Sequence, residues 1–203
     1  MTASWWYPAS TPLILASSSP RRKTILEMIG IPFRQVPGSI AEEDLSGGPE
    51  YVVEHRAMMK ARQVSAEYPG NPVLGADTMV GLDNRLLGKP ATHAEAVDIL
   101  CMLSGRWHTV YGGVALIWEE RGIEFGFSEE TSVRFRKLSK AEIEAYADTG
   151  EPMDKAGAYG IQGVGSLLID RIEGCYFNVM GLPVARFVME LRRAAVSEGS
   201  EDG

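Results

Sequence analysis

The sequence predicts an α/β fold, a mixed sheet with flanking helices, for a chain of 203 residues. In the first half, strand-like apolar runs alternate with helical patterns, as in proteins whose helices cover a sheet. In the second half, residues 108–118 and 124–136 are typical of two antiparallel strands around a turn at Glu120–Gly122. With no repeat or low-complexity linker, we expect one domain of two lobes over residues 13–195, an N-terminal extension (1–12) and a frayed tail (196–203).

Periodicity and end signals predict each element. Apolar or alternating runs indicate strands, apolar residues every three to four positions indicate helices, and Gly, Pro, Asp and Asn mark turns. Capping-box sequences at Thr92–Glu95 and Ser139–Glu142 predict two helix starts. In chain order we expect strand 13–16, helix 20–29, strand 33–36, helix 50–68, strand 73–77 with 79–82 as its candidate continuation, helix 92–104, strands 108–118 and 124–136, helix 139–150, strand 166–172 and helix 183–195.

The start of the first helix breaks a local rule. Ser19 is a suitable N-cap and Pro20 suits the first helical position. The free N–H groups of a first turn favour acidic residues, but this turn carries Arg21, Arg22 and Lys23. Together with the hydroxyl-rich loop that begins at Ser17, they describe a phosphate site. The alternative is a solvated basic turn.

Composition argues against several classes of function. The net charge of −7 disfavours general binding to nucleic acid or to an anionic membrane. Cys101 and Cys175 form neither a zinc motif nor a disulfide framework. The chain shows no membrane-length apolar run and no secretory signal, which predicts a cytoplasmic protein.

Two short segments place charged groups where a ligand could meet them. Asp77 ends an apolar strand, and α/β folds place ligand chemistry at the carboxyl ends of strands. It could hold a divalent cation or act as a base toward water; the alternative is a turn or capping residue. Lys89, between Gly88 and Pro90, suits an ammonium group that contacts phosphate, although a surface lysine in a turn is the simpler interpretation.

The segment Asp154–Gly163 is dense in glycine and in functional side chains. Its small residues let a ligand approach the backbone, Lys155 offers a cation, and the amide of Gln162 can read the edge of a base. The alternative is a tight turn before the next strand. Elsewhere, we expect His108 to be a structural hydrogen-bonding residue.

Cations and acids occur together in these segments, as a polyphosphate bridged by a divalent metal requires. Magnesium takes few protein carboxylates and shares its other positions with water and phosphate oxygens. The chemistry expected is attack of a metal-polarised water on a phosphoanhydride. The residues concerned are the cations Arg21, Arg22, Lys60, Lys89 and Lys155 and the acids Glu42, Asp77 and Asp154.

In this order, the segments resemble the motifs of the Maf family of nucleotide pyrophosphatases. The resemblance spans about residues 13–191, and Ser17–Arg22 and Asp154–Gly163 are its most specific parts. It implies a Maf- and ITPase-like fold with two lobes around a central cleft, often dimeric. It also implies hydrolysis of nucleoside triphosphates to the monophosphate and pyrophosphate with a divalent cation, Mg²⁺ or Mn²⁺. The other matching stretches are Gly75–Thr78, Gly88–Pro90, Gly105–His108 and Asn178–Pro183.

The resemblance also assigns roles by position. Asp77 matches the proton acceptor, and we expect Asp77 and Glu42 to bind the metal. The form of Tyr159–Gly163 is similar to the branch that acts on dTTP and UTP. One departure is Gly112, because the usual Thr-Gly is Gly-Gly here and lacks a hydroxyl. The residues expected to bind substrate are Ser17, Arg21, Arg22, Lys60, Thr78, Lys89, Lys155 and Gln162, of which Arg21, Thr78 and Gln162 match specificity positions.

The leading hypothesis is therefore a cytoplasmic pyrophosphatase for dTTP and UTP that binds neither nucleic acid nor membrane and forms a homodimer. The alternative is a nucleotide-sensing regulator of cell division or septum formation that acts by binding. Asp77 and Glu42 favour the enzyme, because a protein that only senses nucleotides does not need these acids.

Overall fold

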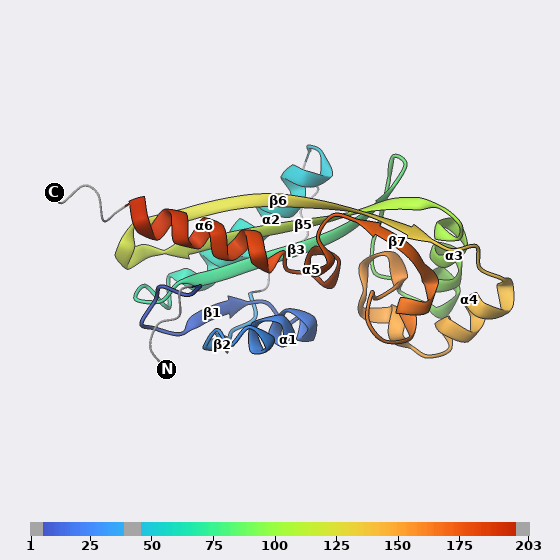
Figure 1. The fold of residues 1–203 in the computed structure, drawn as a ribbon, viewed down its shortest axis with the longest axis horizontal. Coiled ribbons are helices and arrows are strands. Elements are labelled where there is room, and N and C mark those ends of the chain that lie inside the picture. The colour runs from blue at the N-terminus through green and yellow to red at the C-terminus, as the bar shows by residue number, and fades with distance from the viewer. Residues whose placement is uncertain (1–5, 39–45, 198–203) are drawn as a thin grey trace. The chain divides into compact units, whose positions relative to one another are not determined.

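Figure 1 shows the computed structural model, which describes residues 6–38 and 46–197. Strands and helices alternate along the first half, as predicted. The strands are β1 (Leu13–Ala16), β2 (Phe33–Gln35), β3 (Val73–Leu82), β4 (Arg85–Leu87), β5 (Trp107–Trp118), β6 (Ile123–Phe135) and β7 (Ile169–Glu173). The α-helices are α1 (Pro20–Met28), α2 (Pro49–Ser65), α3 (His93–Leu103), α4 (Lys140–Ala147), α5 (Tyr176–Met180) and α6 (Val184–Ser197). Short 3-10 helices cover Glu119–Arg121, Glu151–Asp154, Ala156–Ala158 and Gly163–Leu168.

The strands form one mixed sheet in the order β2-β1-β3-β5-β6-β7, with β4 paired to β3 outside this row. β1 runs parallel to both β2 and β3. The pairs β3–β4 and β6–β7 are antiparallel. The predicted fold class, a mixed sheet with flanking helices, is therefore confirmed.

The chain divides into two compact units. Unit 1 comprises Met1–Asp77, Gly113–Ser128 and Gly181–Gly203, and unit 2 comprises Thr78–Gly112 and Glu129–Met180. The chain therefore passes from one unit to the other four times, three of them within the long strands β3, β5 and β6.

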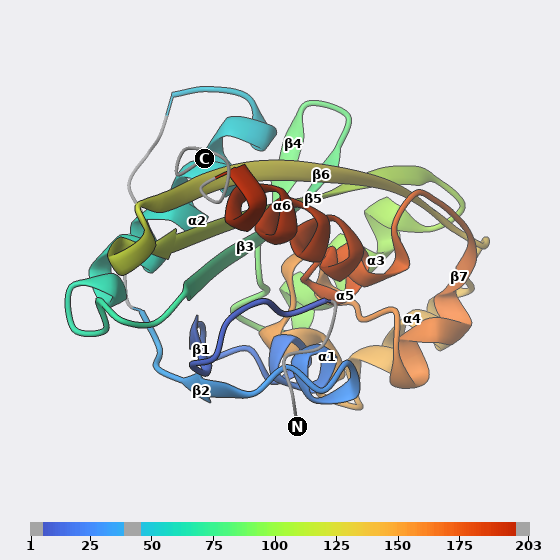
Figure 2. The same ribbon diagram turned by 60° about the vertical axis from the view of Figure 1, so that its left-hand side comes forward.

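In unit 1, the apolar face of α2 packs against β1 and β3 (Figure 2). The residues predicted to share this face, Val53, Ala57, Ala61 and Val64, are all buried. The residues before β1 also pack on this unit. Tyr7 is buried, and the indole N–H of Trp6 donates to the carbonyl oxygen of Ile29 at 3.1 Å.

In unit 2, α3 and α4 cover an apolar core that includes parts of β3, β5 and β6. Phe135 and Leu100 are fully buried there. The capping box at Ser139 is confirmed, because its side chain and that of Glu142 bond reciprocally to the backbone. At Thr92 only half of the box forms, since the Glu95 carboxylate accepts from the N–H of Ala91 instead.

Several predicted boundaries are wrong. Residues 166–168 belong to a 3-10 helix and not to the last strand, which begins at Ile169. α2 ends at Ser65, before Tyr68, and α4 ends at Ala147, before Gly150. The short elements β4 and α5 were not predicted, because segments of three and five residues carry too little periodicity.

Candidate active site

Ser17, in the loop between β1 and α1, is the centre of a small hydrogen-bond network. Its hydroxyl oxygen accepts from the N–H of Ser19 at 3.3 Å and from Nη1 of Arg22 at 2.8 Å. Its carbonyl oxygen accepts from the side-chain amide of Gln35 at 2.7 Å. Ser19 is the N-cap residue of α1, but its own side chain makes no capping bond, contrary to prediction. The hydroxyl that organises this loop is that of Ser17.

The three cations of the first turn of α1 lie in different environments. Arg22 is buried, and its Nε donates to the carbonyl oxygen of Gly181 at 2.9 Å. Arg21 is half-buried, while Lys23 is exposed and lies 3.6 Å from the carboxylate of Glu27. The predicted excess of positive charge at this helix start is therefore present, and one of its cations lies inside the protein.

Burial lowers the pKa of Arg22 to about 10; the nearby Asp77 opposes this change and Arg21 adds to it. A pKa of about 10 still leaves the guanidinium charged at neutral pH. Its Nε and Nη1 donate to neutral oxygens, and its charge interacts with that of Asp77.

α2 approaches β3 closely because small residues meet where they touch. A Cβ atom on Gly75 would overlap with the carbonyl oxygen of Ala57, so only glycine allows this separation. Lys60, one turn further along α2, can then reach β3. Its Nζ lies 2.5 Å from Oδ1 of Asp77.

The Lys60–Asp77 ion pair is partly shielded from solvent, with side chains 20% and 15% exposed. Burial lowers the pKa of Lys60, the Asp77 carboxylate opposes this, and the charge of Arg22 adds to it. Oδ2 of Asp77 accepts no hydrogen bond from any residue that the structure describes. This oxygen is therefore the one able to take a proton, bind a water or meet a cation.

Asp77 lies within β3 and does not end it, and the candidate continuation over residues 79–82 is confirmed. β3 continues without a break through Thr78 to Leu82. The parallel pairing with the short strand β1 nevertheless stops at Ala16 and Gly75, two residues before Asp77. Asp77 thus lies just beyond the carboxyl end of β1. This is the edge of the parallel strands at which α/β folds place ligand chemistry.

The donor set for a metal is small in the described residues. They contain no group of three His, Cys, Asp or Glu side chains suited to hold a metal ion. Glu42, the second predicted metal ligand, lies outside the residues that the structure describes. One carboxylate with an unpaired oxygen fits a cation that takes most of its ligands from phosphate and water.

Ser17, Arg22, Lys60 and Asp77 therefore come together in unit 1, while four other predicted substrate-binding residues belong to unit 2. Of these, Lys89 and Gln162 are exposed, and neither makes a hydrogen bond or ion pair within the described residues. Thr78 follows Asp77 directly on β3. Lys155 is already engaged, with its Nζ 2.6 Å from both Asp154 Oδ1 and the carbonyl oxygen of Glu151.

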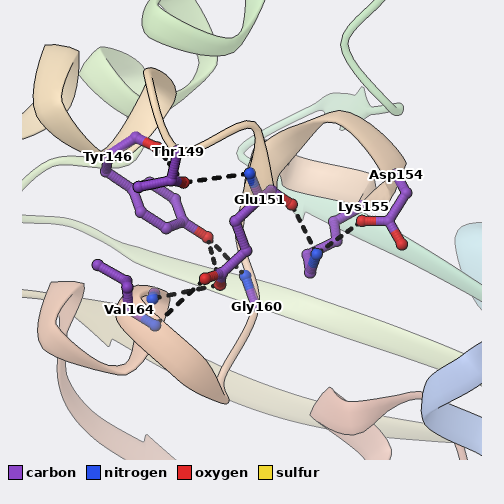
Figure 3. A network of polar contacts seen from close by, with 8 residues as sticks. Tyr146, Thr149, Glu151, Asp154, Lys155, Gly160 and Val164 are labelled. Carbon is purple, nitrogen blue, oxygen red and sulfur yellow. Dashed lines mark hydrogen bonds and ion pairs between the residues drawn. The ribbon is translucent and has the colours of Figure 1, made fainter.

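A second network, which the sequence interpretation missed, surrounds Glu151 (Figure 3). Its carboxylate accepts hydrogen bonds from the Tyr146 hydroxyl at 2.9 Å and from the N–H groups of Val164 and Gly165 at 3.2 and 3.3 Å. The Tyr146 oxygen in turn accepts from the N–H of Gly160 at 3.2 Å. In sequence, Gly150–Pro152 signals only a turn, so nothing marks Glu151 as an acceptor for distant N–H groups.

His108 is a buried structural residue, as predicted. Its Nε2 lies 2.7 Å from the hydroxyl of Tyr159, and the rings of both residues pack edge-on against Phe135. Burial lowers the pKa of His108 to about 4, so the imidazole is neutral at pH 7. Arg106, two residues before His108, pairs with Asp83 at 2.7 Å.

Gly112 lies against Asn178, within unit 2. A Cβ atom at this position would overlap with Oδ1 of Asn178. Asn178 is fully buried, and its Nδ2 lies within 3.1 Å of the carbonyl oxygens of Val110 and Glu129 and of the Thr131 hydroxyl. The side chain of Asn178 therefore occupies the space that a side chain at residue 112 would need.

Comparison with known proteins assigns the chain to a family. The model of the family described as Maf-like protein matches residues 12–194. A dTTP/UTP pyrophosphatase of Symbiobacterium thermophilum is 52% identical over 180 residues, 88% of this chain and 92% of that protein. A dTTP/UTP pyrophosphatase of Bacillus mycoides is 46% identical over 182 residues, 89% of this chain and 94% of that protein. A solved structure, the Ham1 protein of Staphylococcus aureus, aligns with 94% of this chain and all of that chain at a TM-score of 0.49 and 12% identity.

Proposed function

Because this chain belongs to the Maf family, we propose that it is a nucleoside triphosphate pyrophosphatase that converts dTTP and UTP to the nucleoside monophosphate and pyrophosphate. The observation that carries the proposal is its 52% and 46% identity to relatives of that name over nearly nine tenths of the chain. The names of these relatives describe an enzyme and give no support to a regulator of cell division.

The cluster of unit 1 supplies groups suited to this chemistry. The start of α1, with its positive end of the helix dipole and with Arg21, is proposed to bind phosphate oxygens, and the buried charge of Arg22 adds to the attraction. Lys60 holds the Asp77 carboxylate through Oδ1, which leaves Oδ2 to face a water molecule. The guanidinium groups favour the transition state because negative charge on the phosphate oxygens rises as the bond breaks.

The proposed reaction is the attack of water on the α-phosphorus. The new bond joins the water oxygen to the α-phosphorus, and the bond between the α-phosphorus and the bridging oxygen breaks. Asp77 takes the proton of the water, and pyrophosphate leaves with the electron pair of the broken bond. This role uses the one oxygen of Asp77 that no other described residue occupies.

Asp77 and Glu42 are the residues that would hold a divalent cation together with the substrate. When bound, such a cation supplies charge neutralisation on the phosphates and polarises water. The single free carboxylate oxygen in the described part of the site fits a cation that arrives largely coordinated by phosphate.

Base choice is proposed to depend on Gln162, whose amide is exposed and unengaged by the described residues. The edges of uracil and thymine present N3–H and O4, which one amide can pair through its oxygen and its nitrogen. Cytosine presents the opposite pattern, so an amide of fixed orientation would leave polar groups unpaired. Lys89 and Lys155 are proposed to contact phosphate, Lys155 after exchanging one of its present partners.

The test is a product analysis with the purified full-length protein and Mg²⁺ or Mn²⁺. It is incubated with dTTP, UTP, CTP, dATP and GTP, and the products are separated by ion-exchange chromatography. We expect UMP or dTMP and pyrophosphate as first products, with dTTP and UTP turned over fastest. Nucleoside diphosphate and orthophosphate as first products would contradict the proposal.

Two expectations about the setting of the enzyme remain predictions. The proposed substrates are metabolites of the cytoplasm, which is the location expected for the enzyme. No helix in residues 6–38 and 46–197 has the length and apolar character needed to span a membrane. The expected homodimer is open to measurement by light scattering coupled to size-exclusion chromatography.

A further inference from the structure

The loop that carries Gln162 is bonded to the rest of unit 2 at both of its ends. On one side, the N–H of Gly160 donates to the Tyr146 hydroxyl at 3.2 Å. On the other side, the N–H groups of Val164 and Gly165 donate to the Glu151 carboxylate at 3.2 and 3.3 Å. Figure 3 shows Glu151 between these two groups of bonds.

Glu151 joins the two ends into one network. The Tyr146 hydroxyl, which receives the bond from Gly160, donates its own proton to Oε1 of Glu151 at 2.9 Å. Burial raises the pKa of Tyr146, and the neighbouring Glu151 raises it further, so this hydroxyl remains a donor at any working pH. Gly160 and Gly165 are thus linked through two side chains.

Glu151 is itself held on both sides along its backbone. Its N–H donates to the hydroxyl of Thr149 at 3.1 Å, and its carbonyl oxygen accepts from Nζ of Lys155 at 2.6 Å. The carboxylate therefore projects from a fixed point, as the dashed bonds in Figure 3 show. Lys155, a predicted phosphate contact, also contributes to the position of Glu151.

Glycine is required where the loop meets this network. A Cβ atom on Gly165 would overlap with the carbonyl oxygen of Gly160 and lie 2.7 Å from the Tyr146 hydroxyl. A Cβ on Gly163, whose φ is +67°, would lie 3.0 Å from Oε2 of Glu151. The loop backbone is thus drawn against the two side chains as closely as glycine allows.

Gln162, in contrast, has no such support for its own side chain. It is exposed and makes no hydrogen bond within the described residues. Its position is therefore set by the backbone on either side, and that backbone is held by Tyr146 and Glu151.

We propose that Glu151, acting with the Tyr146 hydroxyl, is a positioning residue for base selection: its carboxylate fixes the backbone of Gly160–Gly165 and with it the position from which the amide of Gln162 meets a pyrimidine. This inference rests on the proposed function and on the proposed role of Gln162. It assigns the discrimination of uracil and thymine from cytosine to a carboxylate that does not touch the base.

The proposal predicts why a carboxylate is needed at residue 151. Three donors converge on its two oxygens, and an amide would turn its own NH₂ toward one of them. Glu151→Gln preserves shape and replaces one acceptor by a donor. Tyr146→Phe removes the hydroxyl and leaves Glu151 in place, so it tests the other half of the network.

The experiment compares wild type, Glu151→Gln, Tyr146→Phe and the control Glu144→Gln. Glu144 lies on the same helix as Tyr146, and its side chain makes no hydrogen bond or ion pair within the described residues. For both test variants we expect kcat/KM for UTP relative to CTP to fall by about 10-fold, since the cost of a donor left unpaired is of that order. The loss should appear mainly in KM, because Asp77 and Lys60 belong to the other unit.

Hydrogen–deuterium exchange of peptides covering residues 159–166 gives a readout that does not need turnover. We expect exchange there to be at least about 10-fold faster in Glu151→Gln and Tyr146→Phe and unchanged in Glu144→Gln. Unchanged exchange would show that Glu151 does not hold the loop. Faster exchange with an unchanged ratio of UTP to CTP would also overturn the proposal, because the loop would then be held without setting base choice.

Calorimetric binding of α,β-methylene UTP and α,β-methylene CTP separates this inference from the proposed reaction. If wild type binds the uracil analogue more tightly and Glu151→Gln abolishes the difference, the positioning role stands even if no triphosphate is hydrolysed. If wild type binds both analogues equally, the positioning role fails, whatever the outcome of the product analysis.

Discussion

The polar network of unit 1 and that of unit 2 are built in opposite ways. In unit 1, charged side chains meet one another or buried oxygens, as in the Lys60–Asp77 pair and the guanidinium of Arg22. In unit 2, the Glu151 carboxylate and the Tyr146 hydroxyl bind backbone N–H groups of one loop. The first arrangement concentrates charge, and the second fixes the course of the chain.

The two units also differ in whether their buried titratable side chains are charged at neutral pH. Arg22 has a pKa of about 10 despite its burial and remains a cation at neutral pH. In unit 2, burial lowers the pKa of His108 to about 4 and raises that of Tyr159, so both are neutral. We therefore expect substitutions of Asp77 and Arg21 in unit 1 to act mainly on the rate of reaction, and substitutions of Glu151 and Tyr146 in unit 2 to act mainly on base choice.

The largest expected effect is the loss of turnover in Asp77→Asn. The amide cannot accept the proton of the attacking water, and loss of a general base typically lowers the rate by about 10² to 10⁴. Measured under saturating UTP, kcat should fall by this factor while the circular dichroism spectrum is unchanged. Asp83→Asn is the control, because Asp83 pairs with Arg106 in an exposed turn. A kcat within about twofold of wild type would remove Asp77 from the mechanism.

Alanine variants of the two adjacent arginines of α1 should differ, because Arg22 contributes mainly to stability and Arg21 mainly to activity. Arg22→Ala removes a buried donor to the Ser17 hydroxyl and another to the Gly181 carbonyl oxygen, so we expect a loss of unfolding free energy of about 2–5 kcal/mol. Arg21→Ala, at a half-buried position, should change stability by less than about 1 kcal/mol and still lower kcat/KM. Urea unfolding combined with steady-state kinetics checks both, and equal losses of stability would refute the distinction.

Alanine substitution of two neighbouring glycines of β5 should show how tightly each unit is packed around this strand. A Cβ on Gly113 would overlap with the backbone carbonyl of Val53 in unit 1, whereas a Cβ on Gly112 would overlap with the side chain of Asn178 in unit 2. Overpacking costs about 1–3 kcal/mol, and backbone yields less than a side chain, so Gly113→Ala should destabilise more than Gly112→Ala. Gly88→Ala is the control, since nothing lies within 4 Å of a Cβ there. Thermal unfolding that ranked Gly112→Ala as the most harmful would contradict this order.

The smallest effect at neutral pH concerns His108. Its pKa is about 4 in the folded protein and about 6.5 when unfolded, so the unfolded state binds the extra proton between these values. This contribution to stability is complete above pH 6.5 and is lost as the pH falls toward 4. Over that range it amounts to roughly 3 kcal/mol.

Replacement of His108 tests this contribution, because it should change how steeply the unfolding free energy depends on pH. The pH dependence of the unfolding free energy between pH 6.5 and 4 should be shallower in His108→Gln than in wild type. His93→Gln should not have this effect, because His93 is exposed beside Asp148. An unaltered slope in His108→Gln would show that His108 is not buried as a neutral group.

The sequence was informative wherever local chemistry decides structure. The class of fold, the positions of most long elements, the capping box at Ser139 and the basic first turn of α1 follow from periodicity and end signals. Boundaries were less well predicted, because the ends of α2 and α4 depend on packing that no short window contains. The candidate site residues were chosen by type and by family resemblance, and their roles remain proposals.

The sequence by itself determined the fold class, the family and the residue types that suit polyphosphate chemistry. Only the tertiary structure decided that Arg22 is inside while Arg21 is not, and that Gly75 lets α2 bring Lys60 to Asp77. It also decided that Glu151 holds the Gln162 loop, because its donors are 13 and 14 residues away along the chain. Periodicity reports which face of an element is apolar, but hydrogen bonds between distant segments form only when the whole chain has packed.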